Sequence, residues 1–216
     1  MVDNLFCIRY TSKEKMKIKN YIRKEKIIMN QQAISTKSLV TTAMFTAIVA
    51  ILSILELPSP TGVPFTLQTF AVALCGFVLG TKQGAFCIFL YVLLGAVGIP
   101  IYAGMTGGLS KLFGITGGFL FGFIPMAALC GLKKDSSYKT LTLLFALIGL
   151  ILCHLLGALQ FSLITTAQNS TDFHFFRAVL TVSLPYLPKD ILSVAGAYLV
   201  SLTLKHRLKH TNLSLQ

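Results

Sequence analysis

The stretch TLTLLFALIGLILCHLLGALQFSLIT, residues 140–165, contains no Asp, Glu, Lys or Arg. A helix that crosses the hydrocarbon core of a bilayer needs about 20 consecutive apolar residues, so this stretch is long enough to span a membrane. It lacks the strict alternation of apolar and polar residues that is typical of strands in membrane β-barrels. The stretch therefore predicts a transmembrane helix.

Apolar runs of this kind recur along the 216-residue chain. Hydrophobic residues make up 54% of it and charged residues only 12%, whereas soluble domains carry about 25% charged residues. The runs predict helices at residues 39–57, 65–80, 84–102, 117–132, 140–165 and 184–204. We expect an all-α integral membrane protein that folds as a bundle of six transmembrane helices.

The basic residues predict the orientation of this bundle. The formal net charge is +12, and nine of the 19 Lys and Arg residues precede Leu39. With the N-terminus inside, sixteen lie on the cytoplasmic side, and three remain: Lys111, Arg177 and Lys189. Because cytoplasmic loops are enriched in Lys and Arg, we expect both termini in the cytoplasm and a multi-pass protein of the inner (cytoplasmic) membrane. This spread along the flanks argues against nucleic-acid binding.

Three parts follow from this pattern. Residues 1–37 form a basic cytoplasmic N-terminal segment, residues 38–205 the six-helix transmembrane domain, and residues 206–216 a cytoplasmic tail. The N-terminal segment lacks the apolar core and small-residue cleavage site of a secretory signal peptide, so we expect it not to be cleaved as one.

Two segments on the expected external side are rich in turn residues. In LPSPTG (57–62) and VPFTLQTF (63–70), three prolines disfavour helix, and Gln68 then enters the second helix with an amide that both donates and accepts hydrogen bonds. The glycine-rich stretch over residues 95–119 permits close approach of the backbone to a ligand. It equally permits tight packing between helices.

Asp190 lies near the outer end of the last predicted span. An acidic side chain at membrane depth is costly and indicates a functional site, although an acid is also favoured at a helix N-terminus. His154 in the fifth span is interpreted as a packing residue, Glu56 as an interfacial residue, and the cysteines as small core residues. No zinc, phosphate-loop or nucleophile-elbow motif occurs, so we expect no cofactor and no enzymatic activity.

Three long motifs, in one order, resemble the BioY family of biotin-binding subunits. They are VPFTLQTFAVALCGFVLG (63–80), LYVLLGAVGIPIYAGMTGG (90–108) and GITGGFLFGF (114–123). The resemblance extends over about residues 38–205 and includes the late PKDILS segment. It implies the substrate-binding subunit (S component) of an energy-coupling factor (ECF) importer, which captures biotin in an external pocket capped by the loop between the first two helices.

The resemblance also implies partners. They are a transmembrane coupling subunit and two ABC-type ATPases, which agrees with the missing phosphate loop. The first helix of such subunits docks through an AxxxA face, and Ala43 and Ala47 match that spacing. Small residues let two membrane helices approach closely, but the same alanines could equally pack within the bundle.

Biotin offers two ureido N–H donors, a ureido carbonyl, a thiophane ring and a carboxylate. With the family as a guide, we expect Asp190 to accept from the ureido N–H groups and Gln68 to complement them. Tyr91 is expected to cover the thiophane ring. The expected carboxylate contacts are Thr106, Lys111 and the backbone amides around Gly107 and Gly108.

The chain departs from the family pattern at two positions. The family carries a lysine three residues after the aspartate, where this chain has Ser193. Lys189 directly precedes Asp190 and should point about 100° away around the helix. Either Lys189 or Lys111 supplies the missing cation, or the protein binds with fewer ionic contacts. The tryptophan common in the fifth helix is replaced by Gln160.

Other functions are weighed against biotin capture. Ser193 leaves open a subunit of the same fold that binds another vitamin. A polytopic membrane enzyme acting on lipid would need carboxylates or histidines grouped near one interface, and the sequence shows no such group. The small-residue faces alone would fit a structural assembly protein.

Overall fold

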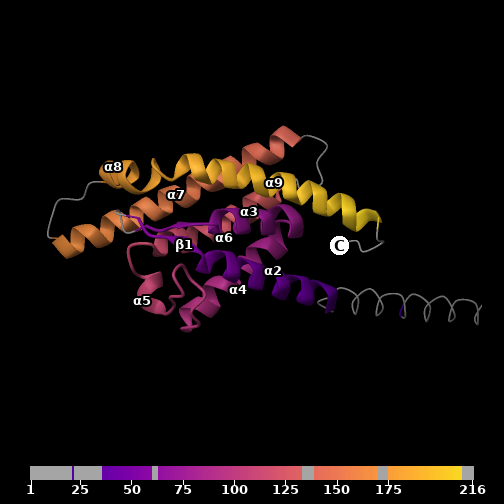
Figure 1. Ribbon diagram of the computed structural model, residues 1–216, viewed down its shortest axis with the longest axis horizontal. Coiled ribbons are helices and arrows are strands. Elements are labelled where there is room, and N and C mark those ends of the chain that lie inside the picture. Colours follow the sequence, from indigo (N-terminus) through magenta and orange to yellow (C-terminus); the bar gives the residue numbers. More distant parts are fainter. Residues whose placement is uncertain (1–20, 22–35, 60–62, 133–138, 170–174, 211–216) are drawn as a thin grey trace, which may run out of the picture. The chain divides into compact units, whose positions relative to one another are not determined.

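The computed structural model describes residues 21, 36–59, 63–132, 139–169 and 175–210 (Figure 1). The chain divides into two units, Met1–Leu39 and Val40–Gln216. Of the first unit, only residues 21 and 36–39 are described. Most of the basic segment expected over residues 1–37 lies outside the described residues, as do Lys133, Lys134 and the last six residues of the tail.

The described part of the second unit is mainly helical. Its longer helices are α2 (Thr36–Ile54, which begins in the first unit), α3 (Gln68–Leu79), α4 (Thr81–Ala96), α6 (Gly117–Gly131), α7 (Lys139–Asn169) and α9 (Leu187–His210). The short ones are α5 (Leu109–Leu112), α8 (Phe175–Ala178) and the π-helix η1 (Val179–Ser183). Among the described residues, α2, α7 and α9 are long and apolar enough to cross a membrane, while α3, α4 and α6 are apolar but shorter. The predominantly helical membrane fold is confirmed to this extent.

Two expected helices have different ends in the structure. The helix expected over 65–80 begins only at Gln68, because Phe65 and Thr66 pair in a strand. The helix expected over 84–102 runs from Thr81 to Ala96. It stops there because Gly98 adopts a φ of 110°, a left-handed conformation that ends helices and that glycine tolerates best.

A two-stranded hairpin, absent from the sequence-based expectations, joins α2 to α3. Strands β1 (Glu56–Leu57) and β2 (Phe65–Thr66) pair antiparallel. Phe65 stacks on Tyr186 with ring centroids 4.4 Å apart, and the Tyr186 hydroxyl donates to the backbone oxygen of Val63. These two contacts hold the hairpin against Tyr186, the residue that precedes α9.

Helices α6 and α7 approach so closely that their backbones nearly touch. A Cβ added at Gly118 would lie 2.3 Å from the backbone oxygen of Leu156, and one added at Gly122 would lie 2.8 Å from Cα of Cys153. At these two positions the glycine-rich stretch serves helix packing. The close approach fixes the turn of α7 that carries Cys153 and His154.

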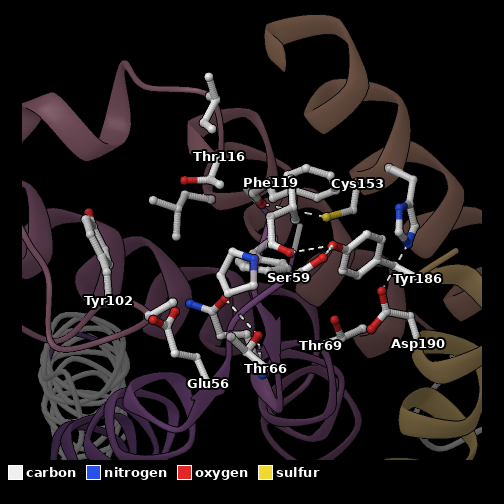
Figure 2. Close-up of a pocket in the computed structure, with 18 of the residues that line it drawn as sticks. Glu56, Ser59, Thr66, Thr69, Tyr102, Thr116, Phe119, Cys153, Tyr186 and Asp190 are labelled. Atoms are coloured by element: carbon white, nitrogen blue, oxygen red, sulfur yellow. Dashed lines mark hydrogen bonds and ion pairs between the residues drawn. The ribbon is translucent and has the colours of Figure 1, made fainter. Parts of the chain in front are cut away.

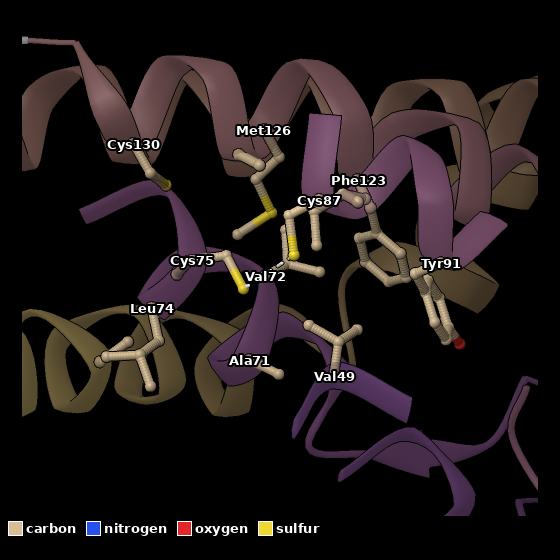
Figure 3. Close-up of a cluster of buried hydrophobic side chains, with 14 of the residues drawn as sticks. Val49, Ala71, Val72, Leu74, Cys75, Cys87, Tyr91, Phe123, Met126 and Cys130 are labelled. Carbon is tan, nitrogen blue, oxygen red and sulfur yellow. Dashed lines mark hydrogen bonds between the residues drawn. The ribbon is translucent and has the colours of Figure 1, made fainter. Parts of the chain in front are cut away.

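The apolar core extends over α2, α3, α4, α6, α7 and α9, and Figure 3 shows the part of it around the cysteines of α3 and α4. Cys75 of α3 and Cys87 of α4 face each other with Sγ atoms 3.9 Å apart, and Met126 and Cys130 of α6 pack beside them. All four side chains are fully buried. The interpretation of the helical cysteines as small core residues is thus confirmed for Cys75, Cys87 and Cys130.

The two sides of α2 differ in character. Gln83 of α4 donates from Nε2 to the hydroxyls of Thr41 (2.8 Å) and Thr42 (3.1 Å). Ala43 and Ala47 are exposed. Polar contacts therefore hold one face of α2 against α4, and the expected docking alanines lie on a face that the rest of the described chain leaves uncovered.

Candidate binding site

A cavity of about 380 Å³ opens between the hairpin, the segment before α6, and helices α6, α7 and α9 (Figure 2). This volume lies within the range of about 300–1,000 Å³ that is usual for small-molecule sites. The lining residues are Glu56, Pro58, Ser59, Val63, Pro64, Thr66, Gln68, Thr69, Tyr102, Ala103, Thr106, Lys111, Gly114, Ile115, Thr116, Phe119, Leu120, Phe123, Leu150, Cys153, His154, Tyr186, Lys189 and Asp190.

One end of the cavity carries a buried ion pair. Asp190 is only 5% exposed, and its Oδ1 lies 2.7 Å from Lys189 Nζ. Its other oxygen, Oδ2, lies 3.2 Å from His154 Nε2. Lys189 Nζ also donates to the backbone oxygen of Thr66 at 2.9 Å. A carboxylate taken out of water is tolerated only when it is paired and hydrogen-bonded, and both conditions hold here.

The expectation that Lys189 would point away from Asp190 is wrong for its charged end. Successive residues of a helix do diverge by about 100° at the backbone. The four-carbon stem of lysine is flexible, however, and it carries Nζ back to the carboxylate. Lys111 also lines the cavity but is exposed. Ser193 is half-buried and is not among the lining residues.

Gln68 lies between the hairpin and α4. Its Oε1 accepts from the Thr66 hydroxyl at 3.1 Å, and its Nε2 donates to the Tyr91 hydroxyl at 2.9 Å. Tyr91 is fully buried and is not among the lining residues. Its place therefore differs from the one expected: it lies behind Gln68 and orients the amide of Gln68.

The other end of the cavity is formed by the segment between α4 and α5. Tyr102 and Thr106 form a short antiparallel backbone bridge. The backbone N–H of Tyr102 donates to the backbone oxygen of Thr106 at 2.9 Å. Burial raises the pKa of Tyr102, so the phenol keeps its proton and donates to the backbone oxygen of Val92. Gly107 and Gly108 belong to the same turn but are not among the lining residues.

Glu56 also lies at this end. A Cβ added at Gly104, whose φ is 66°, would come 2.3 Å from Glu56 Oε1. The carboxylate thus packs directly on the glycine backbone, and Glu56 lines the cavity. The cavity therefore carries acidic and basic groups at both ends, with an apolar wall between them. Among the described residues, no group of three or more His, Cys, Asp or Glu side chains could hold a metal ion.

Comparison with known proteins identifies the family to which this sequence belongs. The sequence model of the BioY family matches residues 26–210. The chain belongs to the BioY family. The protein named biotin transporter BioY2 from Lactococcus lactis subsp. cremoris is 38% identical over 181 residues, which cover 81% of this chain and 93% of that protein. The biotin transporter BioY of Thermotoga maritima is 36% identical over 173 residues, covering 78% and 96%.

A solved structure shares the fold of this BioY-family chain. It is the crystal structure of the S-component for biotin from an ECF-type ABC transporter, with a TM-score of 0.70 and 24% identity. The match covers 81% of this chain and 95% of that one. Together with the three long apolar helices, the family and the fold make this chain a membrane protein.

Sequence reasoning did not anticipate most of the residues that line this cavity, and two ionisable ones among them, Glu56 and His154, were given other roles. Glu56 was interpreted as interfacial and His154 as a packing residue. The partner of His154 lies 36 residues away, so no local pattern points to it. One signal was present: an ionisable side chain inside a membrane helix indicates a functional site by default, and this rule applies to His154 as it does to Asp190.

Gln160, which stands where the family commonly has tryptophan, has a structural contact. Its Nε2 donates to the backbone oxygens of Leu112 at 2.9 Å and Gly114 at 2.8 Å. Gln160 therefore ties α7 to the segment between α5 and α6. Gly114 and its neighbours line the cavity, so Gln160 supports the cavity wall from behind.

Proposed function

We propose that this BioY-family protein binds biotin and delivers it across the cytoplasmic membrane as the substrate-binding component of an ECF-type importer. Family membership, relatives named as biotin transporters and the fold of a biotin S-component support the proposal. The observation that carries it in this chain is the buried Asp190–Lys189 pair at one end of a cavity of about 380 Å³.

The ion pair matches the chemistry of a ureido group. A carboxylate offers about four acceptor sites and an ammonium three donors. Asp190 accepts from His154 through Oδ2, is ion-paired with Lys189 through Oδ1 and has the Thr69 hydroxyl as a further hydrogen-bonding neighbour. At least one of its roughly four acceptor sites is left for a ureido N–H group. Lys189 uses two donors, on Asp190 and on the backbone of Thr66, and its third N–H donates to the ureido carbonyl. Lys189 thus takes the place of the family lysine that Ser193 replaces.

Gln68 complements the ureido head, because its amide retains one N–H and one acceptor site beyond the bonds to Tyr91 and Thr66. A hydrogen bond from the neutral Gln68 amide contributes about 0.5–1.5 kcal/mol, and each charge-assisted bond from Asp190 or Lys189 contributes about 1.5–3 kcal/mol. The apolar wall includes Phe119 and Tyr186. These aromatic rings cover the thiophane, a role that the buried Tyr91 cannot fill.

The biotin carboxylate lies at the opposite end. Thr106 and Lys111 line the cavity there, and the backbone amide of Gly107 lies in the same turn. The amide of Gly108 already donates to the backbone oxygen of Gly95 at 2.7 Å, so it would have to give up that bond to bind the ligand. The Thr106 hydroxyl likewise donates to the backbone oxygen of Ala103 at 2.8 Å and would have to give up that bond. Glu56 disfavours a second negative charge at this end. Lys111 is therefore the main carboxylate contact, with Thr106 beside it.

The topology and the partners belong to the same proposal. The bundle crosses the inner membrane six times with both termini in the cytoplasm, in line with the positive-inside bias. The shorter helices α3, α4 and α6 span a locally thinned bilayer. The exposed Ala43 and Ala47 dock α2 on a transmembrane coupling subunit, which works with two ABC-type ATPases.

Uptake of labelled biotin by cells that lack their own biotin transporter tests this function. Cells that express the chain together with a coupling subunit and two ATPases should accumulate biotin, and an excess of unlabelled biotin should abolish the uptake. Inhibition by another vitamin, but not by biotin, would identify a different substrate for the same fold. Altered lipids in mass spectra, without any uptake, would point instead to a membrane enzyme.

A further inference from the structure

His154 occupies a fixed position between an aromatic ring and the Asp190 carboxylate. Its ring meets Phe119 edge-on, with centroids 5.7 Å apart and an interplanar angle of 88°. Its backbone oxygen accepts from the Ser183 hydroxyl at 3.3 Å. The close packing of α6 at the neighbouring Cys153 removes any room for this turn of α7 to shift. The residue is 5% exposed, so its ring has little freedom to rotate.

The hydrogen bonds of the ring determine where its proton lies. Asp190 is ion-paired with Lys189, so its carboxylate is an acceptor and His154 Nε2 must carry the hydrogen at 3.2 Å. The other ring nitrogen, Nδ1, is buried and has no hydrogen-bond partner among the described residues. A proton on Nδ1 would bury an unsatisfied donor, which is costly, whereas an unsatisfied acceptor is tolerated more often. The contacts therefore place a ring hydrogen on Nε2, where it is donated to Asp190.

We propose that His154 is a positioning residue that holds the Asp190 carboxylate in the orientation needed for ligand binding. This inference rests on the proposed function for its ligand. Lys189 contacts Oδ1 through a flexible stem, and the Thr69 hydroxyl is a second hydrogen-bonding neighbour of the carboxylate. The donor of His154, by contrast, belongs to a ring that packing against Phe119 holds in place. The donor from α7 fixes Oδ2 on the opposite side, and the remaining acceptor sites then face a constant direction.

Three substitutions separate positioning from packing. His154→Gln keeps an N–H donor at about the position of Nε2, His154→Asn carries the same amide on a shorter side chain, and His154→Leu fills the space without a donor. Positioning predicts that the Gln variant binds biotin within about threefold of wild type, and that the Asn and Leu variants bind about tenfold or more weakly, a loss of roughly 1.4 kcal/mol. Packing alone predicts the reverse order, with Leu the best tolerated. That reverse order would overturn the inference.

A double-mutant cycle gives a readout that does not depend on biotin. His154→Leu and Asp190→Asn are measured singly and together by thermal unfolding of the detergent-purified chain. If His154 acts through Asp190, the double variant should unfold well above the temperature that the two single shifts predict when added. Additive shifts would overturn the inference. If the wild type bound no biotin, the proposed function would fail, and this cycle would still decide the role of His154.

Discussion

Replacing Lys189 with methionine should weaken biotin binding far more than the same replacement at Lys111. Lys189 Nζ lies 2.7 Å from Asp190 Oδ1, and the carboxylate side chain is only 7% exposed. In the proposed complex Lys189 donates a charge-assisted hydrogen bond to the ureido carbonyl, and losing that bond costs about 1.5–3 kcal/mol. The Lys189 side chain is 31% exposed, so water recovers part of this loss, and we expect about 2 kcal/mol. That corresponds to a roughly 30-fold higher Kd.

Lys111 provides the matched control, because it lines the same cavity but is exposed. An exposed ionic contact contributes about 0–1 kcal/mol, so Lys111→Met should raise the Kd by about fivefold at most. Equilibrium titration of labelled biotin on detergent-purified variants measures both constants, and thermal unfolding verifies that each variant is folded. An equal or larger loss at Lys111 would refute the assignment of Lys189 as the cation that binds the ureido group.

Three further predictions follow from other contacts. In a Lys189→Met background, Ser193→Lys should regain at least about threefold in biotin affinity, because it places a cation on the Asp190 face of α9. No gain in the titration would argue that Lys189 does not stand in for the family lysine at position 193. Gly118→Ala should lower the unfolding temperature through a loss of about 1–3 kcal/mol, since its Cβ would meet a backbone oxygen at 2.3 Å. Gly196→Ala, whose Cβ would meet only the Phe70 ring at 3.8 Å, should be neutral or stabilising; equal shifts would count against the α6–α7 contact. Gln160→Leu loses two hydrogen bonds of about 0.5–1.5 kcal/mol each, so amide hydrogen exchange over residues 112–116 should become faster. Unchanged exchange would show that Gln160 does not stabilise this segment.

The long helices could be predicted from the sequence because membrane spans are encoded locally. The apolar runs at 39–57, 140–165 and 184–204 correspond to α2, α7 and α9, with ends that differ by a few residues. The hairpin could not be predicted in this way. Each of its strands has two residues, which is too short for a periodic pattern, and its attachment depends on Tyr186, more than 100 residues later in the chain.

The candidate site was predictable in its residue types but not in its contacts. Asp190 stood out because a carboxylate at membrane depth is rare. The position of the Lys189 ammonium was not predictable, since helix geometry fixes the direction of Cβ but not the position of a charge four bonds beyond it. Tyr91 was expected to cover the thiophane ring because small-ligand pockets have mostly apolar walls, yet its hydroxyl bonds to Gln68 and keeps the ring in the core.

Equilibrium binding of labelled biotin to the purified wild type and to Asp190→Asn tests the central claim most directly. The substitution keeps the size of the side chain but removes the charge that pairs with Lys189. We predict saturable binding by the wild type and a loss of at least about tenfold in the variant. Binding that is the same in both chains would place biotin away from Asp190 and contradict the proposed site. A folded wild type that binds no biotin would contradict biotin as the ligand.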